Sequence, residues 1–213
     1  MVELVAVIAV LLMIAGFLSP TLAKSRRHAR AVASLAQCRQ AGVAVYAYAA
    51  RAAEIFPVAH RKAHVAGYEW YKPVIADGGF ANEAAIDPDG VRLNGEVSYI
   101  LSMAMVYSSE AMRPGQTVPI DLAFTSAVRV GDITWPTRKG LLVQMNLFDE
   151  GQVNKWCCVT GQRSVGAVTW ADGSGVSLCW QDLVSDPTRF PYHENAIGTP
   201  VFSTWNGCKG VDR

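Results

Sequence analysis

The residues with the most evident chemistry in this sequence are its five cysteines, four of which lie in the last third of the chain (Cys38, Cys157, Cys158, Cys179 and Cys208). In an oxidising compartment one or two disulfides are expected among the last four, and free buried thiols are the alternative. The adjacent pair would bond outward, for example to Cys179 and Cys208, and the spacing does not fix the connectivity. A zinc site would need CxxC or His/Cys ligand spacing, which is absent.

Other residues could bind a metal. His60 and His64 are four residues apart and would share one face of a helix, although a solvated basic loop is the simpler interpretation. Asp172, with Asp182 and Asp186 nearby, could bind calcium, but the alternating carboxylates of a calcium loop are missing and a hairpin turn explains Asp172. No nucleophile elbow, phosphate-binding loop or dinucleotide fingerprint occurs, so an enzyme is not expected.

The tryptophans are spread along the chain, and we expect them to serve packing, with a sugar-binding face as the alternative (Trp70, Trp135, Trp156, Trp170, Trp180 and Trp205).

A charge-free run of twenty residues, 4–23, lies near the start of the sequence (LVAVIAVLLMIAGFLSPTLA). At about 1.5 Å per residue it would form a helix about 30 Å long, which matches a bilayer core. A retained membrane helix is favoured over a cleaved signal peptide, because no basic segment precedes the run and the run exceeds a typical signal core. A core helix of a soluble protein is the third interpretation. Glu3 either lies at the level of the lipid headgroups, where its carboxylate stays hydrated, or needs a cationic partner, such as the amino terminus of a neighbouring chain.

Residues 24–53 are rich in alanine and contain no proline, so we expect the helix to continue from about residue 2 to residue 53, with Pro57 ending it and Pro20 kinking or locally melting it. Small apolar residues recur at spacings of three, four and seven and predict a narrow stripe along this helix (Ala29, Val32, Ala33, Ala36, Val43, Ala44 and Ala47).

A basic cluster, Lys24, Arg26, Arg27 and Arg30, follows the apolar run directly. Its expected role is contact with lipid phosphates, and pairing with acidic patches of neighbours in a filament is the alternative. Residues 24–72 hold nine basic and two acidic residues, hence net +7, whereas residues 73–213 hold ten and fifteen, hence net −5. With Glu3 the total is +1, which gives no electrostatic case for a nucleic-acid partner.

Together these features resemble the helical start of prepilin-like proteins, which include the major pseudopilin of type II secretion. Residues 1–57 carry the resemblance through an acidic residue, a proline seventeen residues later and a set of positions on the helix (Glu3, Pro20, Cys38, Gln40, Gly42, Ala44, Tyr48, Phe56 and Pro57). Residues 166–174 (GAVTWADGS) are similar to an "ADGS" turn near the end of those proteins. The family's leader ends in Gly before a Phe, and neither precedes Met1-Val2-Glu3 here, so the expectation is either an upstream start codon or no processing.

The resemblance implies an α+β, pilin-like fold and a subunit of a type II secretion pseudopilus or type IV pilus-like filament. Glu3 and Pro20 would serve assembly and register, Cys38 would be packed, and the partners would be copies of the chain, other pseudopilins and platform proteins. It also implies a single-pass protein of the bacterial inner membrane with its head outside the cytoplasm. The basic cluster alone would predict the opposite topology. As loop carboxylates in secretion pseudopilins bind calcium, calcium is the one cofactor considered.

Three segments follow from this reading: a transmembrane half (1–23), an amphipathic stem (24–57) and a globular head (58–213). Within the head, strands are predicted at residues 97–105, 140–148, 165–171 and 176–181, with an edge strand at 117–127 and a hairpin turn at 172–175. We expect a small antiparallel sheet packed on the second half of the helix. The alternative function is an anchored extracytoplasmic binding module for a glycan or cell-wall ligand that never polymerises, and an anchored hydrolase is the least favoured.

Overall fold

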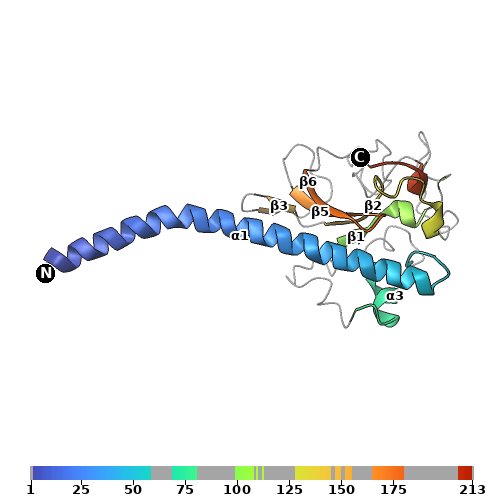
Figure 1. The fold of residues 1–213 in the computed structure, drawn as a ribbon, viewed down its shortest axis with the longest axis horizontal. Coiled ribbons are helices and arrows are strands. Elements are labelled where there is room, and N and C mark those ends of the chain that lie inside the picture. The colour runs from blue at the N-terminus through green and yellow to red at the C-terminus, as the bar shows by residue number, and fades with distance from the viewer. Residues whose placement is uncertain are drawn as a thin grey trace.

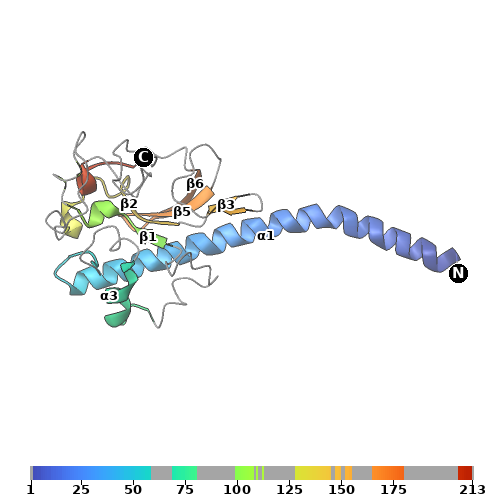
Figure 2. The same cartoon turned by 180° about the vertical axis from the view of Figure 1, so that it is seen from behind.

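One very long helix with a small α+β head on its C-terminal half makes up the fold (Figure 1). It comes from a computed structural model that describes residues 2–58, 69–80, 99–107, 109, 112, 128–144, 147–149, 152–154, 165–179 and 206–212. The long helix, α1 (Val2–Arg51), projects its N-terminal half away from the head in both views (Figures 1 and 2). Residues 3–26 and 28–30 are exposed, so the head begins to cover the helix only beyond them.

The predicted single helix is confirmed, with its end two residues earlier than expected. α1 runs without interruption through Pro20 and is gently curved (Figure 1). The predicted local melting at this proline is therefore not observed. The proline ring removes only one backbone N–H donor, and the hydrogen bonds of the neighbouring turns keep the helix continuous.

The prediction that Pro57 ends the helix was wrong. The chain turns earlier, at Ala53 and Glu54, which both take left-handed backbone conformations with φ of 54° and 65°. Ile55 then forms an antiparallel bridge with Arg129, and the Glu54 carbonyl accepts the next backbone hydrogen bond of this pairing. A tight reversal followed by pairing with a distant segment thus ends the helix.

The head is built on a four-stranded antiparallel sheet in the order β1-β2-β5-β6. Its strands are β1 (Tyr99–Leu101), β2 (Gly140–Gln144), β5 (Val165–Trp170) and β6 (Gly175–Cys179). A separate hairpin joins β3 (Leu147–Asp149) and β4 (Gln152–Asn154). Short helices complete the described part of the head: α3 (Tyr71–Ala76), η2 (Met103–Met105), η4 (Val130–Asp132) and η6 (Gly207–Lys209).

Sequence patterns located the central hairpin well and the other strands less well. β5 and β6 match the predicted strands, and Thr169 pairs with Gly175 across the turn between them. The predicted strand at 97–105 is too long, because η2 follows β1 after one residue, and the predicted strand at 140–148 is divided between β2 and β3. The expected edge strand at 117–127 lies outside the described residues. The α+β class is confirmed.

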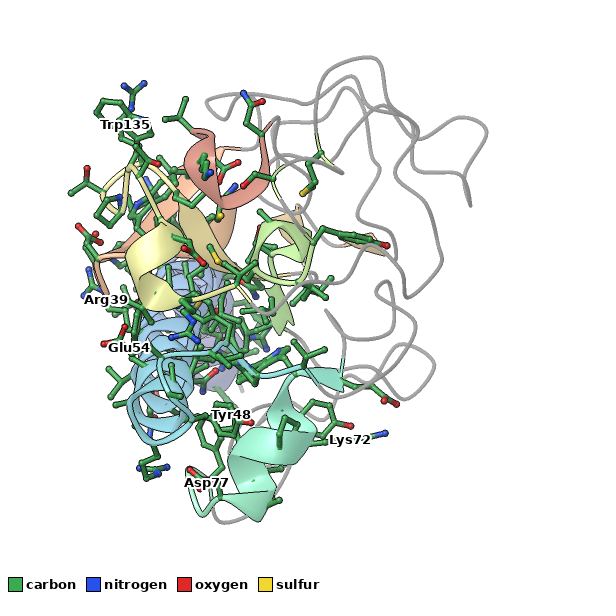
Figure 3. The ribbon with its side chains drawn as sticks, turned by 90° about the vertical axis from the view of Figure 1, so that its right-hand side faces the viewer. Arg39, Tyr48, Glu54, Lys72, Asp77 and Trp135 are labelled. Carbon is green, nitrogen blue, oxygen red and sulfur yellow. The ribbon has the colours of Figure 1, made fainter. Side chains whose placement is uncertain are left out.

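The core lies between the second half of α1 and the sheet. Buried side chains from α1, α3 and the strands form one hydrophobic cluster, so residues 34–56 of the stem share their core with the head. Trp70, just before α3, is fully buried and donates its indole N–H to the Tyr99 carbonyl at 2.8 Å. Near its end α1 also meets α3, to which Arg51 is tied by an ion pair with Asp77. Seen along the helix, Tyr48 and Asp77 lie on the α3 side and Trp135 on the far side of the head (Figure 3).

Gly42 packs closely against the sheet. A Cβ atom at this position would lie 2.8 Å from Cγ2 of Thr169, which is fully buried on β5. Overpacking of this kind costs about 1–3 kcal/mol, and the gain in helix propensity returns about 1 kcal/mol. We therefore expect Gly42→Ala to lower the free energy of unfolding by up to about 2 kcal/mol, measured by thermal or urea unfolding of the detergent-solubilised chain.

Two variants test the cause of this loss. Gly16→Ala places a methyl group on the same helix with no atom within 4 Å of it, so it should leave the unfolding of the head unchanged. Adding Thr169→Ser to Gly42→Ala removes the clashing methyl group and keeps the hydroxyl, and should restore most of the stability. A double variant as unstable as Gly42→Ala would contradict the steric explanation.

Candidate assembly surface on the long helix

One face of the second half of α1 is buried against the head. Ser34, Cys38, Ala41, Val45 and Ala49 are all buried and recur at spacings of three and four residues. The contact begins at Ser34, whose hydroxyl lies 3.2 Å from the Tyr99 hydroxyl of β1. At about 100° per residue these positions lie on one side of the helix.

The opposite face of the same half is exposed and largely apolar, with Arg39 at its edge and Gln40 within it. Of the seven small residues in the predicted stripe, only Ala44 is buried and Ala47 is half-buried. Val32 and Val43 keep 55% and 65% of their surface exposed. We call the exposed members the outer stripe (Ala29, Val32, Ala33, Ala36 and Val43). Since the head covers the other side, the outer stripe is an apolar surface without a partner among the described residues.

The outer stripe continues into the N-terminal half of the helix. Leu4, Leu11, Leu18 and Leu22 follow the same spacings of four and seven residues, and all four are more than half exposed. By length and composition, α1 is the one described helix that could cross a membrane. An apolar face on a single helix therefore extends from the candidate membrane span to beside the head.

Glu3 lies in the first turn of α1, where its negative charge interacts favourably with the helix dipole. It is exposed, and no acidic residue follows it before Glu54. Pro20 lies seventeen residues further along the same continuous helix. The structure thus places both predicted assembly residues on the helix that also carries the outer stripe.

The basic cluster lies between the apolar run and the head, on a part of α1 that the head does not cover. The side chains of Lys24, Arg26 and Arg30 are exposed and form no ion pair with any residue that the structure describes. Positions 27 and 30 continue the spacing of Ser34 and Cys38 and so lie toward the head side of the helix, whereas Arg26 is three residues from Ala29 and lies beside the outer stripe.

Cys38 lies at the centre of the helix–sheet contact. It is fully buried, and its sulfur accepts a hydrogen bond of 3.1 Å from the Thr169 hydroxyl. Burial raises the pKa of the Cys38 thiol from 9.0 to about 12, and the hydrogen bond from Thr169 opposes this only in part. The expectation of a packed rather than a reactive cysteine is confirmed.

This burial predicts a dependence of stability on alkaline pH. The thiol pKa is higher in the folded state than in the unfolded state, so ionisation above pH 9 stabilises only the unfolded chain. We expect wild type to lose, between pH 9 and pH 12, up to about 1.4 kcal/mol per pH unit more than Cys38→Ala. Chemical denaturation at several pH values would measure both slopes. Equal slopes would show that the Cys38 thiol does not ionise on unfolding.

The turn between β5 and β6 is held against α1 by polar contacts. The Tyr46 hydroxyl donates to the Ala171 carbonyl, and burial, together with the nearby Asp172 carboxylate, raises the Tyr46 pKa to about 12. Arg39 donates to the Gly175 carbonyl at 2.5 Å. The Asp172 carboxylate accepts hydrogen bonds from the backbone N–H and hydroxyl of Ser174 at 2.9 and 2.6 Å. These bonds belong to the hairpin turn that the sequence predicted.

The structure gives the predicted disulfides no support. Cys208 is a buried free thiol, 3.4 Å from the Ser109 hydroxyl. Cys157 and Cys158 lie outside the described residues, and for Cys179 only the strand is described. Among the described side chains, no group of three or more His, Cys, Asp and Glu residues could hold a metal. His60, His64, Asp182 and Asp186 lie outside the described residues.

Among the described tryptophans, Trp70 and Trp170 are buried and serve the core. Trp135 is half exposed, on the loop before β2. Trp156, Trp180 and Trp205 lie outside the described residues, so the structure assembles no aromatic ligand face from the part it describes.

Sequence reasoning missed one buried polar pair. Lys139 and Asp212 are both fully buried, with Nζ and Oδ2 3.0 Å apart. The same carboxylate accepts the Gly140 N–H at 2.8 Å, and the Asp212 N–H donates to the Arg138 carbonyl at 2.8 Å. These contacts fasten the segment around residue 212 to the start of β2. No sequence pattern would have paired two residues so far apart.

Comparisons with protein families, curated proteins and solved structures found no match for this chain.

Proposed function

We propose that this protein is a structural, non-enzymatic subunit of a filament of the pseudopilus or type IV pilus-like kind, anchored in a bacterial inner membrane by α1. In this proposal copies of the chain, with other pseudopilins and platform proteins, assemble through α1 while the head covers the helical core from outside the cytoplasm. The resemblance of residues 1–57 to prepilin-like proteins suggests the type of assembly.

The observation that carries the proposal is the outer stripe. A helix that only anchored and supported the head would need one apolar face toward the sheet and a polar face toward water. Instead, Ala29, Val32, Ala36 and Val43 expose apolar side chains away from the head, with Gln40 as the one polar residue among them. Small residues allow helix backbones to approach closely, both in lipid and between packed helices. Burial of this face against another copy would remove it from water.

Cysteine crosslinking tests the proposal at adjacent positions. Ala29→Cys places a thiol on the outer stripe, and Arg30→Cys places one on the next residue, about 100° around the helix. Both positions are exposed and lie at nearly the same height on α1. Because one added thiol forms only one disulfide, oxidation in native membranes should give covalent dimers for Ala29→Cys and few for Arg30→Cys, after subtraction of the wild-type background.

Strict monomers for both variants would reject assembly and favour the anchored binding module. Equal yields of dimer from the two variants would reject the outer stripe as the interface. Mass spectrometry of the N-terminal peptide from native membranes adds an independent test. An N-methylated peptide that begins upstream of Met1, after a Gly, would support processing of the prepilin type, whereas an unprocessed Met1 would favour a static anchor.

A further inference from the structure

We infer that the basic cluster is a binding site for anionic phospholipid headgroups, on the exposed part of α1 between the apolar run and the head. The inference rests on the membrane anchoring in the proposed function and does not depend on assembly.

The first observation is the position of the cluster along the helix. Lys24 directly follows the apolar run, and Arg30 lies six residues further, or about 9 Å along the axis. The headgroup region of a bilayer is about 5–8 Å thick on each side. Because Lys and Arg side chains can bend back toward an interface, all four cations can reach lipid phosphates. The first contact with the head, at Ser34, is about 15 Å beyond the apolar run.

The second observation is that these charges lack compensation. The sequence contains no acidic residue between Glu3 and Glu54. Lys24, Arg26 and Arg30 are exposed and have no ion-pair partner among the described residues. Net charge in the helix segment is therefore strongly positive where it meets the membrane surface, and anionic lipid supplies the complementary charge.

The third observation separates lipid from a neighbouring subunit as the occupant. Positions 27 and 30 lie toward the head side of α1, Arg26 lies beside the outer stripe, and the outer stripe itself lies away from the head. A second helix that packed on the outer stripe would lie away from most of these cations. A layer of headgroups surrounds a membrane helix, so it meets the cluster whichever way the helix is rotated.

The test compares lipid binding by the full chain in dodecyl maltoside micelles. Labelled phosphatidylglycerol and phosphatidylcholine with the same acyl chains are titrated into wild type, Arg26→Gln/Arg30→Gln, and the control Arg129→Gln/Lys209→Gln. The control removes the same charge from two exposed cations of the head. Each cation near a lipid surface contributes about fivefold in affinity for an anionic lipid. Removal of two cations in Arg26→Gln/Arg30→Gln should therefore reduce the preference for phosphatidylglycerol by about 25-fold. In the control this preference should change by less than about twofold, and salt at about 1 M should abolish the preference in wild type.

Equal affinity of wild type for the two lipids would overturn the inference, as would an unchanged preference in Arg26→Gln/Arg30→Gln. Complete displacement of phosphatidylglycerol by inorganic phosphate would also overturn it, because the site would then bind free anions. The Ala29→Cys dimer should survive addition of Arg26→Gln/Arg30→Gln. Loss of that dimer with unchanged lipid preference would assign the cations to a neighbouring subunit instead. Extraction of the chain by alkaline carbonate tests the anchor alone, so failure of the anchoring and failure of the lipid site are distinguishable.

Discussion

Replacement of Asp212 by alanine is expected to lower the free energy of unfolding of the head by about 3–5 kcal/mol. Lys139 and Asp212 are both completely buried, and their charged atoms are 3.0 Å apart. Removal of the carboxylate leaves the ammonium group in the core without this counter-ion and leaves the Gly140 N–H without its 2.8 Å acceptor. Because a small domain is held by only about 5–15 kcal/mol, the head should unfold at a much lower denaturant concentration.

A double-mutant cycle separates the charge from the packing. Lys139→Met alone leaves the Asp212 carboxylate buried without the ammonium, so it should also be strongly destabilising. Lys139→Met/Asp212→Asn removes both charges and keeps an oxygen that can accept from Gly140, so it should be much closer to wild type than either Asp212→Ala or Lys139→Met. Urea unfolding followed by tryptophan fluorescence measures all four proteins. If the losses of the two single variants simply added in the double variant, the pair would not be acting as a buried ion pair.

The sequence was sufficient for features that depend on neighbouring residues. Length and lack of charge predicted the membrane-compatible run, alanine content predicted a helix that continues beyond it, and the Asp172-Gly173 turn predicted the β5–β6 hairpin. Features that depend on distant residues were missed. The end of α1 is set by pairing of Ile55 with Arg129, and β1 stops early because the chain enters η2.

The candidate assembly surface was predictable only in part, because both faces of the stem carry small residues. Cys38 and Ala41 on the buried face resemble Ala33 and Ala36 on the exposed face in size and polarity. Periodicity alone therefore identified a stripe without showing which side the head would cover. Which face is buried depends on packing against strands that are remote in sequence.

Glu3→Ala is expected to leave membrane insertion intact and to reduce assembly by about tenfold or more, which corresponds to at least about 1.4 kcal/mol for each contact between subunits. The carboxylate lies at the first turn of a long exposed apolar helix, where desolvation without a cation is unfavourable. In the proposed assembly the amino terminus of an adjacent copy would supply that cation and set the register between the helices. Loss of the charge removes this attraction while making the segment easier to insert.

Three substitutions at the start of α1 separate charge from shape in this prediction. Glu3→Gln keeps the size of the side chain without its charge and should fail as Glu3→Ala does, whereas Glu3→Asp should retain part of the assembly. Val5→Ala removes exposed apolar surface two residues away, about 100° around the helix from Leu4 and off the face of the outer stripe, and should change the yield of the Ala29→Cys dimer by less than about twofold. Carbonate extraction checks that each variant is inserted. A Glu3→Gln variant that forms the Ala29→Cys dimer in undiminished yield would exclude a charge-based register, and assembly would then rest on the packing of the outer stripe alone.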